Sequence, residues 1–560
     1  MSLIETRSHQ MFPVLDFAQI ETAKRFAIGD ARHFTPHEVV YDAGELFAPA
    51  WLVIEGEINV VRRDGLDREA AVTTHGVGQL TGELSQLSGR PSLARGRAGT
   101  RGCAAVSFDA AHLRALVVGS AEVGEVIMRA FILRRVALIQ DGGSGSVVVG
   151  VPGNPALVRL QGFLTRNGYP HLVLDVSTDE GGRALVERLG VRPAELPLMV
   201  SPNGTVLRAP TDAEAGVFLG ITPKLDPEAV YDVTVVGAGP AGLAAAVYAA
   251  SEGLSVLVLD QRSFGGQAGA SARIENYLGF PTGISGQALA GRAFNQALKF
   301  GAEVAIPLEV SQFDCDDSKR LPGAPLKLQL TDGRYVRSRT VVVASGARYR
   351  RPEISNLSIF EGAGVSYWAS PIEAKLCEGE DVALVGGGNS AGQAAVFLAP
   401  KVKRLHLMVR GKGLEATMSR YLIDRLGALS NVELHIGTEV IALEGNRTTG
   451  LTGAVFRHRS NGTTSRCALR HLFLFIGAEP NTSWLQNCAA MDAKGFLRTG
   501  EDFQGNASRL GRHTLPLETS IRGMFAIGDV RSGSTKRVAA AVGEGAAVVP
   551  QIHGALALQT

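Results

Sequence analysis

The sequence predicts a multidomain chain: a small β-barrel with helices, then a compact α/β module, then two parallel-sheet nucleotide-binding domains. Three observations support this fold class. The chain has 560 residues, enough for three or four domains. The pattern of apolar runs and turns changes on either side of a Gly- and Ser-rich stretch at 141–146. Two glycine-rich turns in its second half each follow an apolar run and open an Ala-rich helical stretch.

Composition excludes several function classes. Lys and Arg number 56 and Asp and Glu 54, so the chain lacks the excess of basic charge that binding to nucleic acid or an anionic membrane requires. The N-terminus shows no basic segment followed by an apolar run, and no stretch of 18 apolar residues occurs. We therefore expect a cytoplasmic protein without a membrane span and without a nucleic-acid partner.

The five cysteines are scattered, and no two of them form a Cys-x-x-Cys pair. We expect all of them to be reduced thiols, buried or at the surface, as is usual in the cytoplasm. They are Cys103, Cys315, Cys377, Cys467 and Cys488.

Residues 1–140 alternate short β-like runs such as "WLVIEGEINVVRRDG" with glycine turns, and end in the apolar helical stretch "EVGEVIMRAFILRRVALI". This pattern predicts a β-barrel closed by a helix. The stretch "GQLTGELSQLSGRPSLARGRAG" at 78–99 resembles the phosphate-binding cassette of cyclic nucleotide-binding domains. The resemblance covers the Gly-Glu-Leu motif, here Gly82, Glu83 and Leu84, with Glu83 in the place of the acid that binds the ribose.

The cassette departs from that family at its phosphate-binding arginine, whose place is taken by Ser92. An arginine matters there because its planar fork balances a buried phosphate charge. Arg90 and Arg95 are the nearby cations that could replace it, although neither occupies the family's position. Two alternatives stay open: a nucleotide ligand in this domain, or a degenerate module for interaction or dimerisation.

Residues 141–146, "DGGSGS", have the composition of a flexible linker. Residues 147–222 then predict strand, helix, strand, helix, two hairpin strands and a helix, and resemble the thioredoxin or glutaredoxin fold. In that family a cis-proline lies beside the redox site, which makes Leu196–Pro197 a candidate cis bond. The redox cysteines should follow the first strand, where "VGVPGNP" at 149–155 has none.

The first glycine fingerprint lies in "YDVTVVGAGPAGLAAAVYAASEGLSVLVLD" at 231–260. A strand, a Gly-x-Gly-x-x-Gly turn, a helix and a second strand ending in an acid together predict a Rossmann-like dinucleotide domain. The turn lets the backbone approach a pyrophosphate at the helix N-terminus, and Asp260 would accept hydrogen bonds from the adenosine ribose. We interpret this as an FAD site, formed by Gly237, Gly239, Pro240, Ala241, Gly242, Asp260 and Gln261.

The second fingerprint lies in "DVALVGGGNSAGQAAVFLAPKVKRLHLMVRGKG" at 381–413. Asp260 follows Gly237 by 23 residues, and the same step from Gly386 reaches Val409, with Arg410 next. A cation there pairs with a 2′-phosphate that an acid would repel, so we predict NADPH rather than NADH. The alternatives are a solvated strand-end charge at Arg410, or a second bound FAD. The predicted site comprises Gly386, Gly388, Asn389, Ser390, Ala391, Arg410 and Lys412.

Residues 230–555 resemble the bacterial low-molecular-weight thioredoxin reductases over their whole length. The resemblance rests on five ordered stretches: "GGQAGASARIENYLGFPTGISG", "VVVASGARYRRP", "FLFIGAEPN", "TSIRGMFAIGDVRS" and "STKRVAAAVGEGA". It implies a split FAD domain, at 230–348 and 474–555, with the NAD(P)H domain inserted at 349–473. It also implies a homodimer in which the nicotinamide domain rotates toward the flavin.

The resemblance further implies flavin contacts outside the first fingerprint. Asp529 corresponds to the acid that hydrogen-bonds the ribityl chain, and Ser345 takes the place of a threonine. The contacts implied are Gly266, Gln267, Asn276, Ala344, Gly346, Gly528, Asp529, Lys536, Arg537 and Val538.

One expected feature is missing from "YWASPIEAKL" at 367–376. The family's Cys-x-x-Cys falls on Ala369 and Ile372 when aligned backward from the second fingerprint, and on Trp368 and Pro371 when aligned forward from "GVSY". Neither register contains sulfur. Because a thiolate must attack the substrate disulfide, thioredoxin reduction by this chain alone is chemically unsupported.

No catalytic residue is assigned from this stretch, but two candidates lie near the expected flavin. Glu373 matches the family's proton-donating acid in the backward register, whereas in the forward register it replaces a glycine. Its alternative is an exposed acid at a helix N-terminus. Trp368 or Tyr367 could cover the flavin face that the cysteines leave vacant, or either could be an ordinary core aromatic.

The sequence therefore predicts an FAD-dependent pyridine-nucleotide oxidoreductase. A hydride would pass from NADPH to FAD and then to an external small-molecule or small redox-protein acceptor, without an internal redox disulfide. The alternatives are reduction of an external dithiol protein, ferredoxin–NADP reductase-like activity, and a redox- or nucleotide-sensing scaffold.

Overall fold

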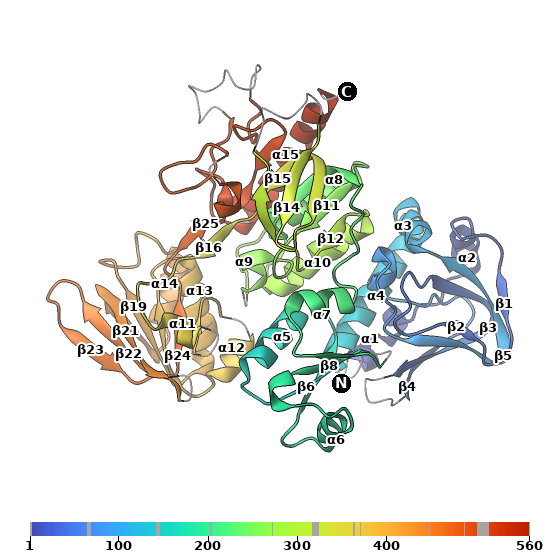
Figure 1. Cartoon of the computed structure of the whole chain (residues 1–560), viewed down its shortest axis with the longest axis horizontal. Helices are drawn as coiled ribbons and strands as arrows, with labels where there is room; N and C mark the ends of the chain where they lie inside the picture. Colours follow the sequence, from blue (N-terminus) through green and yellow to red (C-terminus); the bar gives the residue numbers. More distant parts are fainter. Residues whose placement is uncertain are drawn as a thin grey trace.

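The computed structural model describes residues 3–63, 69–141, 146–201, 204–271, 273–315, 324–361, 364–369, 371–446, 449–486, 488–500 and 514–558. The chain passes in order through an N-terminal part, a middle part, an FAD-type domain and an inserted α/β domain before it returns to the FAD-type domain (Figure 1). Among the described residues, no helix is long and apolar enough to cross a membrane.

The N-terminal part is an antiparallel sheet flanked by helices. Its strand order is β1-β5-β3-β4, with β2 also paired to β5. One apolar cluster around Trp51 and Val53 fills the sheet, and a second around Phe108 and Phe131 joins it to the helices. The elements are α1 Leu3–Met11, α2 Phe17–Lys24, β1 Arg32–Phe34, β2 Val39–Tyr41, β3 Ala50–Arg63, β4 Glu69–His75, η1 Leu84–Ser88, β5 Arg95–Phe108, α3 Ala110–Gly119 and α4 Ala121–Asp141.

The middle part has the order of strands and helices expected for 147–222. Its sheet runs β7-β6-β8-β9, with β6 and β7 parallel and the other pairs antiparallel. The Leu196–Pro197 peptide bond is cis, as predicted. Most of the predicted linker, 142–145, lies outside the described residues. The elements are β6 Ser146–Gly150, α5 Pro155–Arg166, β7 His171–Asp175, α6 Glu180–Arg188, β8 Leu198–Val200, β9 Val206–Arg208 and α7 Asp212–Phe218.

The FAD-type domain is built on one sheet of order β12-β11-β10-β15-β14-β13, with β26 paired to β15. The parallel core strands are buried on both faces, as expected for a sheet covered by helices. Its elements are β10 Val230–Val236, α8 Pro240–Ser251, β11 Val256–Leu259, α9 Gly266–Gly269, α10 Gly286–Lys299, β12 Glu303–Ala305, β13 Val310–Phe313, β14 Leu326–Leu330, β15 Tyr335–Val343, β26 Met524–Ala526 and α15 Val538–Ala557.

The inserted domain has a parallel sheet of order β17-β24-β18-β19-β20 and a second, antiparallel sheet β21-β22-β23. The two chain crossings to the FAD-type domain, β16 Ala347–Tyr349 and β25 Ala478–Pro480, pair with each other as an antiparallel ribbon. The other elements are α11 Leu357–Phe360, β17 Val365–Ser366, α12 Pro371–Leu376, β18 Asp381–Val385, α13 Asn389–Leu398, β19 Arg404–Val409, α14 Arg420–Gly427, β20 Val432–Ile436, β21 Thr438–Asn446, β22 Gly450–His458, β23 Thr464–Cys467 and β24 His471–Leu474.

The first three parts share one apolar core, which runs from Leu93 through the helices of the middle part into the FAD-type domain. Hydrogen bonds join the same surfaces. The Asn167 side chain donates to the carbonyl of Arg262 at 3.0 Å, and the Thr222 hydroxyl donates to the carbonyl of Ile306 at 2.6 Å. The middle part is therefore packed onto the FAD-type domain and does not form an independent domain.

The expectation that all five cysteines are reduced thiols is wrong for two of them. Cys315 and Cys488 form a disulfide, with their Cα atoms 5.8 Å apart. The two residues are 173 positions apart in the sequence, and only the folding of the split domain brings them together. Cys103, Cys377 and Cys467 are free.

Candidate active site

The first glycine turn joins β10 to α8 at the carboxyl end of the parallel sheet. Gly237 has φ +114°, and a Cβ atom there would lie 2.3 Å from the carbonyl oxygen of Ala344. A Cβ on Gly242 would lie 1.9 Å from the carbonyl oxygen of Gly237. Pro240 is the first residue of α8, so the open helix N-terminus faces the turn. Only glycine fits at these two positions, as in a pyrophosphate-binding turn.

Asp260 directly follows β11 and faces the same turn. Its carboxylate accepts hydrogen bonds from the backbone N–H groups of Ala238 at 2.9 Å and Arg262 at 2.8 Å. Burial raises the pKa of Asp260, while these backbone donors oppose the rise. The sequence-predicted acid and turn therefore lie together at one strand edge.

A pocket of about 330 Å³ opens at this edge. Gly237, Asp260 and Gln261 line it from the fingerprint, and Ser345 and Trp484 line it from two distant segments. The Nε1 atom of Trp484 is buried and has no hydrogen-bond partner among the described residues. A polar adenosine moiety fits this pocket because Asp260, Ser345 and Asn481 give its lining polar and charged groups.

Trp484 is a lining residue that the sequence did not reveal. It lies in η5, Ser483–Leu485, more than 200 residues after the fingerprint. Its only sequence signal is its position shortly after "FLFIGAEPN". The Cys315–Cys488 disulfide lies on the same side of the domain, linking the end of β13 to the segment after η5.

The other predicted flavin contacts lie on three segments around the first turn. Gly266, with φ +53°, begins α9 and approaches Gly239, and the Gln267 side chain donates to the carbonyl of Ala347. Ala344 is buried, Gly346 has φ +64°, and Asn276 is exposed. Arg537 caps α15, and Val538 is its first residue.

Asp529 and Lys536 form the polar end of this arrangement. The Lys536 ammonium donates to the backbone carbonyl of Asp529. Burial raises the pKa of the Asp529 carboxyl, and the charge of Lys536 opposes that rise. The N–H of Gly528 donates to Glu544 of α15 at 2.6 Å, which holds the loop against the helix.

The second glycine turn joins β18 to α13. Gly386 has φ +156°, and a Cβ there would lie 2.5 Å from the carbonyl oxygen of Phe475. Gly388 caps α13, Ala391 is buried, and Ser390 is exposed. The Asn389 side chain accepts a hydrogen bond from the N–H of Ser419 at 2.6 Å.

Arg410 follows the last residue of β19, as Asp260 follows the last residue of β11. Arg410 and Asp260 therefore occupy corresponding positions in the fold. Counting 23 residues from the glycine turn had reached Val409, one residue before Arg410. Arg410 and Lys412 are both exposed at this edge. The charge of Arg410 contributes to lowering the pKa of Glu439, after the larger effect of a hydrogen bond from Arg457.

The side chains of the cysteine-free stretch 367–376 lie in two different environments. Tyr367 stacks on Tyr349, with ring centroids 5.8 Å apart and planes 17° apart, and its hydroxyl donates to Glu361 at 2.6 Å. Burial, and then the charge of Asp529, raise the pKa of Tyr349 to about 12. This aromatic pair therefore lies on the side of the predicted ribityl acid.

Trp368 and Glu373 lie on the other side of the stretch. The Trp368 indole N–H donates to the Glu373 carboxylate at 2.9 Å. Glu373 also interacts electrostatically with Arg166 of the middle part. Burial lowers the pKa of Arg166, and the negative charges of Asp212 and Glu373 partly oppose that change. In Figure 1, α12 accordingly lies beside α5. Glu373 is half-buried in α12, and its proximity to the flavin stays a prediction.

The free thiols are poor nucleophiles. Burial raises the pKa of Cys377 to about 11, and that residue is fully buried at the end of α12. Burial also raises the pKa values of Cys103 and Cys467. At neutral pH these three side chains are protonated thiols, and a thiolate is what attacks a disulfide.

The nucleotide cassette of the N-terminal part is assembled, but its cations already have partners. Glu83 caps η1, accepts from the N–H of Ser85 at 3.0 Å and lies 3.4 Å from Arg135. Gly82 has φ +95°, and Leu84 is buried. Ser92 is buried, and its hydroxyl donates to the carbonyl of Ala94 at 2.8 Å.

Arg95 and Arg90 both bind protein groups. Arg95 makes two hydrogen bonds to the Asp42 carboxylate, at 2.7 and 3.0 Å. Arg90 donates to the carbonyl of Ile221 at 3.3 Å and lies over the ring of Phe294 in α10. Burial lowers the pKa of Arg90 to about 10. The cassette thus contacts the middle part and the FAD-type domain.

Comparison with known proteins agrees with this arrangement. Residues 231–545 match the pyridine nucleotide-disulphide oxidoreductase family, and residues 31–119 match the cyclic nucleotide-binding domain. The chain is 32% identical over 331 residues to a thioredoxin reductase of Mycoplasma pneumoniae, covering 59% of this chain and 96% of that one. It is 31% identical over 323 residues to NADPH-dependent thioredoxin reductase 3 of Arabidopsis thaliana, covering 57% of each chain, so it spans little over half of that relative.

A solved structure shows the same fold. The thioredoxin reductase of T. acidophilum is 27% identical and superposes with a TM-score of 0.51, covering 58% of this chain and 99% of that one. The matched region contains both glycine turns and the closing motifs. The chain therefore belongs to the pyridine nucleotide-disulphide oxidoreductase family and is an NAD(P)H-dependent flavoprotein oxidoreductase of the thioredoxin-reductase type, with an N-terminal cyclic nucleotide-binding domain.

Proposed function

We propose that this enzyme uses NADPH and FAD to reduce an external acceptor without a Cys-x-x-Cys dithiol. The observation that supports this most directly is the contrast between two intact dinucleotide turns and a sulfur-free stretch between them. The enzyme class follows from the family. The choice of acceptor and the absence of a dithiol step are our inference.

The residues around the first turn fit FAD. The turn at Gly237 and Gly242 has no room for side chains, and Asp260 and Trp484 line the pocket beside it. Asp529 and Lys536 would then flank the ribityl chain and the ring edge. When bound, FAD supplies hydride acceptance from a nicotinamide and onward electron transfer.

NADPH is favoured over NADH by the charge at the end of β19. Arg410 occupies the fold position that Asp260 occupies in the first half. A guanidinium there offers a 2′-phosphate paired hydrogen bonds, whereas it offers the ribose of NADH no matching acid. The same charge disfavours a second FAD at this turn.

A small acceptor is favoured over a protein disulfide for two reasons. Tyr367 and Tyr349 form a stacked aromatic pair on the side of the predicted flavin, and Tyr367 directly precedes the positions on which the family's dithiol would fall. Trp368 and Glu373 are turned toward the middle part, whose 147–222 segment contains no cysteine. We infer a thioredoxin-like fold for that segment from its β7-β6-β8-β9 sheet and flanking helices, and we assign it a covering role instead of a redox one.

The test is anaerobic stopped-flow mixing of the purified chain with NADPH, followed at the 450 nm flavin band. We expect the band to bleach and to return when a quinone or ferricyanide is added. Reduction of an aromatic disulfide such as DTNB, or of an added thioredoxin, should stay at the level of free FAD. Cysteine-to-serine variants at Cys377, and at Cys315 together with Cys488, should give the same turnover as the parent chain.

Three outcomes would overturn the proposal. An absence of bleaching would mean that the nucleotide sites do not support hydride transfer and would favour the sensing scaffold. Disulfide reduction that the Cys315→Ser/Cys488→Ser variant loses would mean that this disulfide is the missing redox pair. Thiol release that requires an added dithiol protein would favour the external relay.

A further inference from the structure

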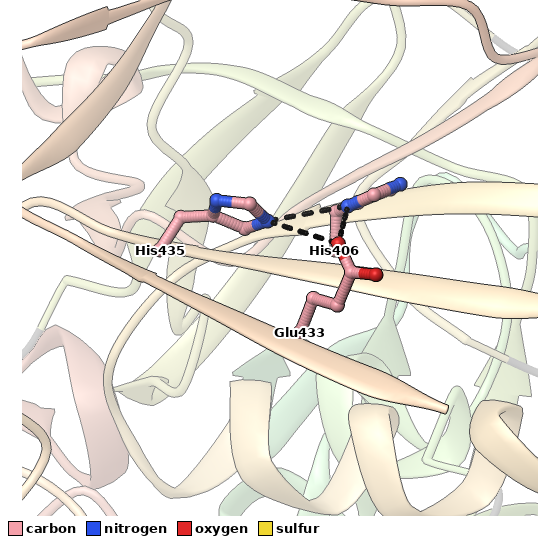
Figure 2. A group of neighbouring side chains, drawn as sticks. All are labelled: His406, Glu433 and His435. Atoms are coloured by element: carbon pink, nitrogen blue, oxygen red, sulfur yellow. Dashed lines mark hydrogen bonds and ion pairs between the residues drawn. The ribbon is translucent and has the colours of Figure 1, made fainter. Parts of the chain in front are cut away.

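Two histidines and a glutamate converge on one face of the inserted domain, away from both glycine turns. His406 lies on β19, and Glu433 and His435 lie on the neighbouring edge strand β20. Figure 2 shows the three side chains pointing toward one another. Nothing in the proposed oxidoreductase chemistry uses them.

The strand register explains why they meet. β19 and β20 are parallel, and His406 is the direct partner of Glu433. Glu433 and His435 are two residues apart on one strand, so their side chains emerge on the same face. Leu405, Leu407 and Val409 of β19 alternate with His406 and pack against the opposite, helix-covered side of the sheet. Backbone pairing therefore holds the three side chains on one face.

The separations of the three ligand atoms match a metal site. His406 Nδ1 lies 3.2 Å from His435 Nε2 and 3.2 Å from Glu433 Oε2, and the last two atoms are 3.8 Å apart. A point equidistant from all three atoms lies about 2.0 Å from each, and zinc binds imidazole nitrogen and carboxylate oxygen at about 2.0–2.2 Å. At the longer of these distances the point lies out of the plane of the three atoms, which leaves a fourth position for water.

Hydrogen bonding alone satisfies this cluster poorly. One proton on His406 Nδ1 can serve the two neighbouring acceptors only by being shared, and 3.8 Å is too long for a bond between His435 and Glu433. A divalent cation would satisfy all three atoms at once. The Glu433 carboxylate is also oriented for this role, because Arg404 lies 3.1 Å from its other oxygen, Oε1.

The exposure of the three side chains suits a site that exchanges metal with solvent. The His406 side chain is 11% exposed, whereas those of His435 and Glu433 are 37% and 46% exposed. One ligand is thus fixed in the sheet, and two are accessible from outside. The two imidazole nitrogens are borderline ligands and the carboxylate oxygen is a hard one, a set that suits zinc or a neighbouring first-row divalent metal better than Mg²⁺ or Ca²⁺, which prefer oxygen ligands alone.

We propose that His406, His435 and Glu433 form a zinc-binding site that joins the edge strand β20 to β19 in the nicotinamide-type domain. Binding displaces protons or water from the two imidazoles and involves no redox step. Because the cluster lies on a sheet face and Arg410 lies at the strand end, we expect zinc to stabilise the domain without occupying the nucleotide site.

The test uses the full-length chain with FAD, first dialysed against EDTA and then titrated with Zn²⁺ in competition with a chromophoric chelator. We expect one high-affinity zinc per chain. Glu433→Gln and His435→Asn should each weaken binding by at least about tenfold, as expected for the loss of a ligand. His458→Asn, which changes a histidine of β22 in the same domain, should bind zinc like the parent.

A second measurement separates a metal site from a merely structural cluster. Zinc should slow hydrogen exchange of the β20 amides at 432–436 in the parent chain and in His458→Asn, but not in His435→Asn. Co²⁺ in place of Zn²⁺ should give the visible absorption of a four-coordinate site. Equal zinc affinity in the parent, Glu433→Gln and His435→Asn would overturn the proposal, and so would the absence of zinc uptake by the parent.

Discussion

At the scale of single residues, Gly237 shows how strongly one backbone position constrains the site. Its φ of +114° costs any residue with a Cβ some energy, and the turn also leaves no space for that atom. The neighbour that a Cβ would strike is a backbone carbonyl, which cannot rotate away as a side chain can. The requirement for glycine is therefore steric as well as conformational.

We expect Gly237→Ala to lose FAD. The new Cβ would lie 2.3 Å from the carbonyl oxygen of Ala344, so the turn must open, and bound FAD per chain after gel filtration should fall at least about fivefold. Gly253→Ala is the matched control, because Gly253 also has a positive φ, +86°, but no heavy atom of the described residues lies within 4 Å of the place its Cβ would take. Equal FAD content in the two variants would contradict the prediction.

Arg410 is the residue on which, in the proposed function, coenzyme choice depends. It is exposed at the end of β19, where its guanidinium is free to approach a bound phosphate from solvent. A charged hydrogen bond of this kind contributes about 1.5–3 kcal/mol. The contribution applies only to the phosphorylated coenzyme.

Arg410→Ala should therefore raise the KM for NADPH by about tenfold or more and change the KM for NADH by less than about threefold. Steady-state kinetics with ferricyanide as acceptor measures both values. Lys403→Ala, just before the other end of β19, is the control and should alter neither. Unchanged KM values for both coenzymes would show that Arg410 is only a solvated strand-end charge, and a parallel rise in both would show that it does not select the 2′-phosphate.

At the scale of elements, η1 and the residues after it have become a contact surface. The cassette of a nucleotide-binding domain here packs on α10, and Arg90 donates to the carbonyl of Ile221. Pro91 lies against Gly220, where a Cβ would come within 2.3 Å of its ring. The cassette therefore forms part of the packing interface between the N-terminal domain and the domain that contains the first glycine turn.

Arg90→Ala should loosen that connection. Loss of the hydrogen bond and of the contact with Phe294 should increase hydrogen exchange in 84–93 and 290–298 by about fivefold or more, because both interactions involve a partly buried charge. Arg101→Ala, at an exposed position on β5, should leave exchange there unchanged. Unchanged protection in Arg90→Ala, together with lost cyclic AMP or cyclic GMP binding, would instead identify Arg90 as a phosphate ligand.

At the scale of the whole molecule, several connections join the inserted domain to the rest of the described chain. They include the β16–β25 ribbon and an ion pair between Arg425 of α14 and Glu275, 2.6 Å apart. Glu275 belongs to the predicted flavin-contacting stretch, and α14 begins next to the second glycine turn, since Ser419 bonds to Asn389. The pair therefore holds the nucleotide turn close to the flavin side.

Arg425→Glu should slow hydride transfer by about two- to fivefold, which is the effect expected for a partly exposed ion pair worth up to about 1 kcal/mol. The rate of 450 nm bleaching after mixing with NADPH measures it. Arg420→Glu is the control, since Arg420 forms its ion pair with Asp424 of its own helix. A rate in Arg425→Glu equal to that of the control would exclude a role for this orientation.

Short sequence patterns predicted local features of this molecule, but they did not predict contacts between distant segments. Both glycine turns, the acid after the first one and the helix–strand order of the middle part follow from short sequence patterns with known backbone geometry. The Cys315–Cys488 disulfide, the Trp484 lining of the pocket and the Tyr349–Tyr367 stack join segments far apart or on opposite sides of a domain crossing. The periodicity of apolar residues and the spacing of motifs do not indicate which of these distant residues will be in contact.

The sequence by itself determined the enzyme class and the lack of a Cys-x-x-Cys spacing, because glycine turns and closely spaced cysteines are local features that residue identity decides. Only the tertiary structure decided where the remaining polar groups act. It turns Glu373 toward the middle part, uses Arg90 and Arg95 for protein contacts, and brings His406, Glu433 and His435 together across two strands. The physical reason is that strand register and domain packing bring together side chains that are distant in the sequence.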